Sequence, residues 1–126
     1  MSFEKILREV LNECGGGLGI ALMGSDGIPI VQLSAELEPG LPNPLGDDIG
    51  TAAVEFARIL CEIQKAADAL NAGAMMETVI NLARFQLLFR QVDDDVFLVL
   101  ALSPTGNAGK ARYLIRRHLL QLRSDL

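Results

Sequence analysis

The residues of this chain whose spacing comes nearest to phosphate chemistry are two glycines and a lysine near its C-terminus. Gly106, Gly109 and Lys110 are expected between a strand and a helix, where backbone amides can attract an anion. The full phosphate-loop pattern GxxxxGK[ST] is absent, because Pro104 stands at its first glycine and Ala111 replaces the hydroxyl residue that would hold magnesium. We therefore expect no nucleotide site at this position.

The other reactive side chains form no catalytic or metal-binding constellation. The single histidine, His118, lies beside two arginines, without a nearby carboxylate or serine that could complete a triad. The run Asp93–Asp95 lacks the ligand spacing and the later glutamate of a calcium loop. Cys14 and Cys61 form no CxxC motif, and we interpret both as buried free thiols. The sequence thus predicts neither an enzyme nor a cofactor or metal site.

The composition predicts one domain over residues 1–126 that needs a partner. Half of the residues are hydrophobic but only 5% are aromatic, and the mean hydropathy is +0.31. This aliphatic excess exceeds what a small domain easily hides, which favours an obligate partner. The longest apolar runs, such as Val96–Leu102, fall far short of the roughly 20 residues that cross a bilayer. No signal-peptide layout is visible, so we expect a cytoplasmic protein without membrane insertion.

Periodicity and turn residues predict three helices and five strands. The expected helices cover residues 2–13, capped by Ser2, about 47–70, capped by Asp47 or Asp48, and a last segment starting near 105–107. The expected strands cover residues 18–23, 28–33, 75–83, 85–92 and 96–102. The run Gly15–Gly17 stops the first helix, and the proline-rich stretch Ser34–Gly46 forms a loop.

The strand patterns also predict the order of the sheet. Residues 18–23 and 96–102 are apolar on both faces, so we expect them to be central neighbours. Pro29 cannot donate to a ladder and assigns residues 28–33 to an edge. The fold class is therefore α/β (α+β) with the order αββαβββα, and a five-stranded mixed sheet in the order 2-1-5-4-3 carries helices on both faces.

The middle helix presents three different faces. Its polar side chains gather in one arc that is expected to meet solvent or a charged partner: Asp48, Thr51, Glu55, Arg58, Glu62 and Lys65. A bulky stripe is suited to packing on the sheet: Ile49, Phe56, Ile59, Leu60, Ile63 and Leu70. A third strip of mostly small residues allows a second backbone to come close: Gly50, Ala53, Val54, Ala57, Cys61 and Gln64. A two-fold copy of the same helix is the simplest occupant, and a loop of the same chain is the alternative.

The strand after this helix is expected to have an open edge. Thr78, Ile80 and Leu82 alternate with Val79 and Asn81 in a strand that is expected to be half exposed, and neither proline nor a central lysine blocks pairing. A second protomer that adds its own strand there would place the two middle helices side by side. Together with the small-residue strip, these three residues form the predicted dimer interface.

Charge divides the chain into two parts. Residues 1–102 carry 6 basic and 15 acidic groups, a net charge of −9, whereas residues 103–126 carry 5 basic groups and 1 acidic group, a net charge of +4. The basic last helix either docks an acidic or phosphate-rich partner or is simply a solvated face. Nucleic acid is not expected as a partner, because the whole chain is acidic and poor in aromatic residues.

With these elements in place, the chain resembles the roadblock-type dynein light chain domain family, which is related to the longin and profilin-like folds. The resemblance lies in the first hairpin with its Asp-Gly turn (residues 18–30), the Ala-rich helix (52–70) and the start of the last helix (107–112). Stand-alone prokaryotic members of this size are similar to the bacterial gliding-motility GTPase regulator. The stretch from Glu38 to Leu45 is longer than the minimal connection of the family.

The resemblance implies a function in signalling and cell polarity. It implies homodimers, or heterodimers with a paralogue, built through the second helix and third strand. It also implies a Ras-like small GTPase as partner, for which such proteins act in GTPase activation, in exchange or as scaffolds, by reorganising the residues of the GTPase itself. Arg58 lies on the expected docking arc but is not interpreted as an arginine finger. The alternative is a small-molecule sensor module of PAS or GAF type, which requires an internal polar pocket.

Overall fold

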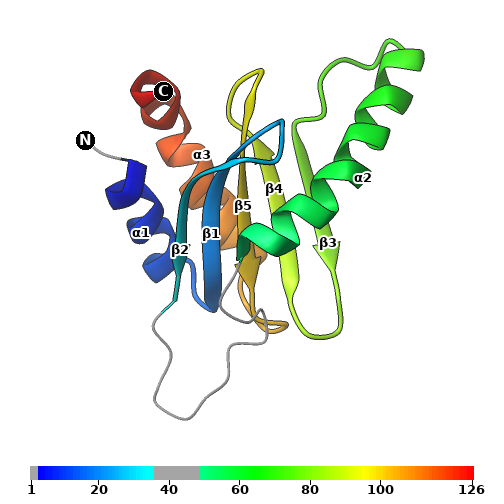
Figure 1. Cartoon of the computed structure of the whole chain (residues 1–126). Coiled ribbons are helices and arrows are strands. Elements are labelled where there is room, and N and C mark those ends of the chain that lie inside the picture. The colour runs from blue at the N-terminus through cyan, green and yellow to red at the C-terminus, as the bar shows by residue number, and fades with distance from the viewer. Residues whose placement is uncertain (1–2, 36–48) are drawn as a thin grey trace.

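The computed structural model describes residues 3–35 and 49–126 and contains the eight expected elements in the expected order (Figure 1). The helices are α1 (Phe3–Glu13), α2 (Ile49–Ala69) and α3 (Ala108–Asp125), and the strands are β1 (Gly17–Gly24), β2 (Pro29–Ser34), β3 (Glu77–Asn81), β4 (Gln86–Gln91) and β5 (Val96–Leu102). Ser34, the first residue of the predicted loop, is instead the last residue of β2. The part of that loop over residues 36–46 and the predicted caps Ser2, Asp47 and Asp48 lie outside the described residues.

The strand order β2-β1-β5-β4-β3 is the predicted one, but the sheet is not mixed. All four neighbouring pairs are antiparallel. Between β2 and β3 the chain passes along α2 from one edge of the sheet to the other, so these two strands run in the same direction without being neighbours. A crossover helix therefore does not create a parallel pair here, because three strands separate the strands that it joins.

Burial explains why β1 and β5 occupy the centre. Every residue of β5 is buried, and so are the six inner residues of β1. Pro29 pairs with Met23 beyond an irregularity in the register at the start of β2, at the edge of the sheet, which is where a residue without a backbone N–H is tolerated.

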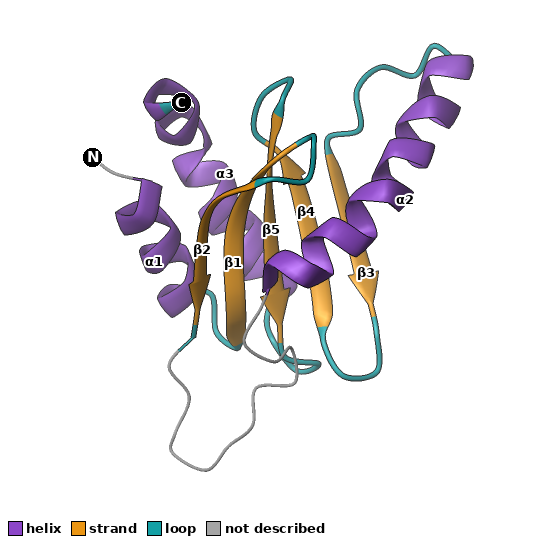
Figure 2. Cartoon of the chain, viewed as in Figure 1, coloured by secondary structure: helices purple, strands orange, loops and turns teal. Residues whose placement is uncertain are grey.

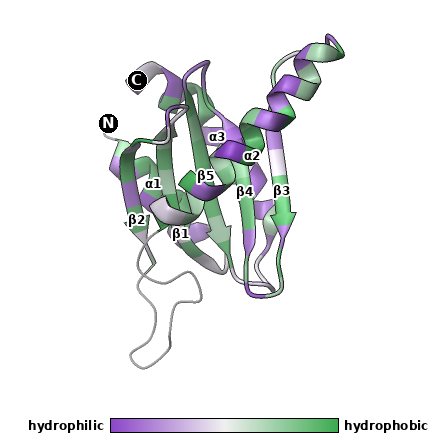
Figure 3. Ribbon diagram, turned by 45° about the vertical axis from the view of Figure 1, so that its right-hand side comes forward, coloured by the Kyte–Doolittle hydropathy of each residue, from purple (hydrophilic) through white to green (hydrophobic). Residues whose placement is uncertain are grey.

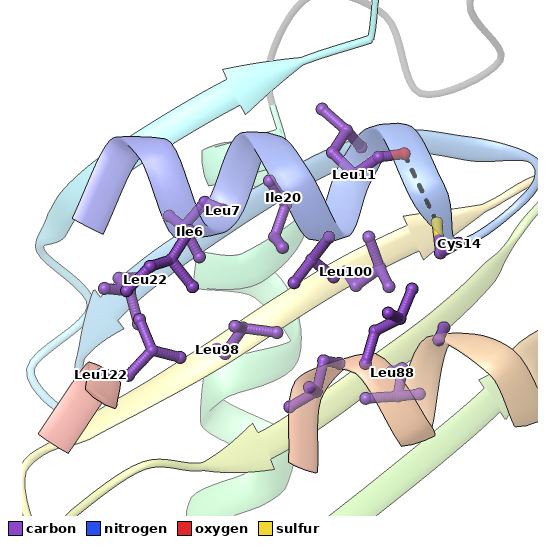
Figure 4. Packing of buried hydrophobic residues seen from close by; sticks show 14 of the residues in the cluster. Ile6, Leu7, Leu11, Cys14, Ile20, Leu22, Leu88, Leu98, Leu100 and Leu122 are labelled. Atoms are coloured by element: carbon purple, nitrogen blue, oxygen red, sulfur yellow. Dashed lines mark hydrogen bonds between the residues drawn. The ribbon is translucent and has the colours of Figure 1, made fainter. Parts of the chain in front are cut away.

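Helices α1 and α3 cover one face of the sheet, and α2 crosses the other face (Figure 2). The core under α1 and α3 is mainly leucine, isoleucine and valine; Ile20, Leu22 and Leu100 of the sheet meet Leu7 of α1 and Leu122 of α3 (Figure 4). These large aliphatic side chains are fully or almost fully buried, so this layer supplies much of the hydrophobic free energy of folding.

Cys14 is buried beside this layer, as predicted. Its thiol donates to the backbone oxygen of Leu11 over 3.5 Å (Figure 4). Burial raises the pKa of the Cys14 thiol above its ordinary value, because the apolar surroundings disfavour the thiolate. Cys14 is therefore an inert core residue.

Candidate interaction surface

The face of α2 that contacts the sheet is the one with the small residues. Gly50, Ala53 and Ala57 are buried there together with Ile49 and Leu60. Short side chains allow the helix axis to come close to the strands, as in any tight helix packing. The prediction that these three small residues face a partner copy is therefore contradicted by their burial against the sheet of the same chain.

Half of the bulky stripe of α2 is exposed, contrary to the prediction that the whole stripe packs on the sheet. Ile59 is 49% exposed, Ile63 39% and Leu70 78%. Ile59 stands about 100° before Leu60 around the helix axis, so when Leu60 faces the sheet Ile59 faces outward. The C-terminal half of α2 also projects past β3 (Figures 1 and 3), where the described chain covers it less.

Exposed and half-buried apolar residues recur at a regular spacing along one flank of α2 and just past its end. Spacings of four and three alternate along one flank of the helix, and its members are Ala52, Phe56, Ile59, Ile63, Ala66 and Leu70. We call this set the α2 flank stripe. Alternating steps of four and three form the seam along which two helices pack. Four of its members, Phe56, Ile59, Ile63 and Leu70, belong to the stripe that the sequence pattern predicts to pack on the sheet.

The α2 flank stripe lies on the side of the helix nearest β3 and β4. The ring of Phe56 lies 6.2 Å from that of Phe89 of β4, and Phe56 and Ile80 of β3 both pack against the core cluster under α2. The stripe and the outer edge of the sheet at β3 are therefore neighbouring surfaces.

Val54 and Cys61 lie on the opposite flank of α2. Val54 lines a groove with Pro29 and Gln32 of β2, and Cys61 lines a hollow of about 280 Å³ with Ser25 and Asp94. Cys61 is exposed, so its prediction as a buried thiol is wrong. Val54 therefore faces the β2 edge of the sheet, whereas Cys61 faces the strand connections and the segment at Ala74 and Met75 that leads into β3.

Gln64, the last member of the predicted strip, anchors the connection from α2 to β3. Its side-chain amide donates to Asp68 and to the backbone oxygen of Gly73, and its side-chain oxygen accepts from the backbone N–H of Met75 at 2.8 Å. Asn71 and Gly73 both have positive φ in this turn, as predicted for the end of the helix. The Gln64 side chain is therefore occupied within its own chain.

The described members of the polar arc are all exposed, as predicted. Two ion pairs of the i,i+3 type cross it, between Glu55 and Arg58 at 3.7 Å and between Glu62 and Lys65 at 3.0 Å. The hydrogen bond with Glu62 raises the pKa of Lys65; both pairs are solvated, so they contribute little to stability. Thr51 lies on the same face, whereas Asp48 lies outside the described residues.

β3 has a free outer edge within the described part of the chain, as its place at the end of the strand order requires. Thr78 and Ile80 are half-buried and Leu82, just beyond the strand, is exposed. The Thr78 hydroxyl donates to the sulfur of Met75 at 3.2 Å. A strand that ends a sheet keeps unpaired backbone donors and acceptors on its outer side, so this edge can accept another strand.

The turn at Gly15 and Gly16 contacts the loop that precedes α3. The backbone oxygens of Gly15 and Gly16 accept from the amides of Asn107 and Ser103 at 3.2 and 2.8 Å. The Asn107 side chain caps α3 by accepting from the Lys110 amide. The amides of Asn107, Lys110 and Ala111 at this end of α3 thus have acceptors within the chain.

The described residues contain no group of three or more histidine, cysteine or acidic side chains arranged to hold a metal. None of their helices is long and apolar enough to span a membrane. Their buried core contains no polar or charged residue, which disfavours the internal polar pocket that a sensor module of PAS or GAF type requires. What distinguishes the molecule is a set of surfaces: the α2 flank stripe, the β3 edge and the polar arc.

Several solved structures are similar to this chain over nearly its whole length. MglC from Myxococcus xanthus is 35% identical over the full length of both chains, with a TM-score of 0.70. The gliding protein MglB from Thermus thermophilus is 23% identical, with 97% of this chain and 86% of that chain covered and a TM-score of 0.80. A Roadblock/LC7 domain from Streptomyces avermitilis has a TM-score of 0.80 at 13% identity, over 98% and 97% of the two chains. No protein-family model and no curated protein matches the sequence.

Proposed function

The chain belongs to the roadblock domain family, and we propose that it acts as a non-enzymatic, dimeric regulator or scaffold of a Ras-like small GTPase in the cytoplasm. The observation that carries this proposal is the apolar α2 flank stripe beside the free edge of β3. The similarity to MglC and to the gliding protein MglB favours a regulatory role. Whether the partner copy is identical or a paralogue, the surface that it covers is the same.

The dimer that we propose differs from the one predicted from sequence. The partner's β3 adds to the edge at Thr78, Ile80 and Leu82, and the two α2 helices meet through the flank stripe. Gly50, Ala53 and Ala57 are not part of this contact, since they are buried under α2. Burial of Ile59, Ile63 and Leu70 from two chains supplies the hydrophobic driving force.

Analytical ultracentrifugation tests this arrangement. Exchange of both Ile59 and Ile63 for glutamate should convert a dimer into a monomer that remains folded, because both side chains are exposed within the chain and four carboxylates would otherwise face one another. Val54→Glu is the matched control, since Val54 is equally exposed but lies on the opposite flank. A wild-type chain that is monomeric at micromolar concentration contradicts the dimer.

The polar arc is the proposed docking surface for the GTPase. In a pair of α2 helices joined along the flank stripe, Glu55, Arg58 and Glu62 stay solvated, so a charged partner can reach them. The partner's identity is tested by pull-down with a Ras-like GTPase encoded near this chain, loaded with GDP or with a GTP analogue. Preferential capture of the GTP form supports activation of hydrolysis, and equal capture supports a scaffold.

The arc itself is tested by charge reversal. Glu55→Lys should weaken capture of the GTPase, whereas Glu13→Lys, an exposed glutamate at the end of α1, changes the net charge equally and should not. Loss of capture with both variants assigns the effect to net charge alone and contradicts docking on the arc.

A further inference from the structure

Helix α3 exposes two large side chains on its outer face. Tyr113 is 62% exposed and Leu120 77%. They are seven residues apart, about two helical turns, and therefore lie on the same side of the helix. The opposite side holds the residues that pack on the sheet: Ala111, Leu114, Ile115, Leu119 and Leu122. Fold stability therefore does not require an apolar side chain at position 113 or 120.

Basic residues border this pair on both sides. Arg112 and Arg116 lie on one flank, and Lys110 and Arg117 on the other; all four are exposed. The result is a two-turn apolar strip between two cationic borders, on a helix whose segment of the chain has a net charge of +4. Tyrosine and arginine are the residues that concentrate binding energy at protein interfaces.

The structure holds one of these borders in place. Glu77 of β3 forms ion pairs with three arginines: Arg90 at 3.6 Å, Arg116 at 3.8 Å and Arg112 at a shorter distance. One carboxylate cannot neutralise three guanidinium groups, so this cluster keeps a net positive charge. The Arg112 and Arg116 side chains are 45% and 60% exposed, and each guanidinium has N–H donors beyond those that reach Glu77.

We propose that the outer face of α3 binds an acidic amphipathic helix of a partner protein. Apolar side chains of that helix, spaced by one heptad, would contact Tyr113 and Leu120, and its carboxylates would pair with Arg112, Arg116 and Arg117. Because Glu77 already orients two of these arginines, less side-chain entropy is lost on binding. A membrane fits less well, since the chain as a whole has a net charge of −5 and only two large apolar side chains project here.

The outer face of α3 lies on the other side of the sheet from the α2 flank stripe and the polar arc, and Arg112 and Arg116 reach β3, the proposed dimer strand, through Glu77. α3 lies on the face of the sheet opposite α2 (Figures 1 and 2). Binding to α3 would therefore leave the polar arc of α2 free, and one molecule could connect two partners. The proposal stands on a single chain and does not depend on the dimer or on the GTPase.

Fluorescence anisotropy with a designed probe tests the proposal. The probe is a labelled helical peptide of about 20 residues with leucine once in each heptad and glutamate and alanine elsewhere. Saturable binding is expected, and it should weaken several-fold as NaCl rises from about 50 to about 300 mM. Joint exchange of Tyr113 and Leu120 for serine should weaken binding about tenfold, and Arg117→Glu should reduce both the affinity and its salt dependence.

The controls separate this contact from simple charge attraction. Lys5→Glu, an exposed position on α1, changes the net charge as much as Arg117→Glu and should leave binding unchanged. A probe with lysine in place of glutamate should not bind, and equal binding of both probes overturns the proposal. So does binding that survives the serine exchanges, or capture by phosphatidylserine vesicles without peptide binding. Concentration-dependent self-association that is lost with Leu120→Ser assigns the face to a second copy and also overturns it.

Discussion

Gly16 makes a tight contact that the sequence pattern alone does not show. Its φ is +89°, and a Cβ atom there would lie 2.8 Å from the Ser103 hydroxyl oxygen and 2.9 Å from the Gly106 Cα. The glycine run was predicted only to stop α1, and it does so. It also allows the α1–β1 turn to pack against the loop before α3. Gly16 and Gly106 thus serve one contact within the fold.

This contact predicts a large difference between two glycine-to-alanine exchanges. Gly16→Ala should destabilise the protein by about 3 kcal/mol, because the alanine adds a backbone clash to the cost of a positive φ. Gly27→Ala should cost only about 1 kcal/mol, since Gly27 has φ +87° but no atom within 4 Å of the added Cβ. Urea denaturation measures both values; equal losses would show that the contact with Gly106 is unimportant.

At the scale of elements, the assignment of the α2 faces leads to a stability prediction. Ala53 is fully buried between α2 and the sheet, so Ala53→Leu forces the helix away from the strands and should cost about 1–3 kcal/mol. Ala69→Leu, at the exposed end of the same helix, should leave stability nearly unchanged. If Ala53→Leu weakens dimerisation without lowering the stability of the monomer, the small residues face a partner after all.

The same helix shows which parts of the fold the sequence could predict. The order of strands followed from β1 and β5, because burial on both faces leaves only apolar residues at those positions. For α2 the apolar residues cover more than half of the circumference, and periodicity does not tell which part meets the chain's own sheet. The length of α2 and the place where it crosses the sheet decide which residues are buried. α2 contacts the sheet through its first twelve residues, and Ile63 and Leu70 lie beyond that contact. The mixed sheet was wrongly predicted for a similar reason. The sequence pattern does not tell whether the strands joined by the crossover helix α2 are neighbours, and β2 and β3 are in fact separated by three strands.

For the whole molecule, the charge pattern and the apolar surfaces lead to different responses to salt. The proposed dimer contact consists of the α2 flank stripe and the β3 backbone edge, and apolar burial is not screened by ions. The GTPase contact on the polar arc and the partner contact on α3 are both charged, and their affinity should fall as ionic strength rises. One salt titration can therefore distinguish the apolar dimer contact from the two charged contacts.

We expect the dimer dissociation constant to change by less than about threefold between about 50 and about 500 mM NaCl, measured by sedimentation equilibrium. Over the same range, binding to the polar arc should weaken by more than about tenfold. The physical reason is that Ile59 and Ile63 lose contact with water on association, whereas Glu55 and Arg58 exchange one set of charged neighbours for another. A dimer that dissociates at high salt would place its interface on the charged arc and would contradict assembly through the flank stripe. Glu55→Lys is the control for the dimer measurement. It reverses a charge on the arc without changing any apolar residue of the stripe, so the dimer dissociation constant should stay the same.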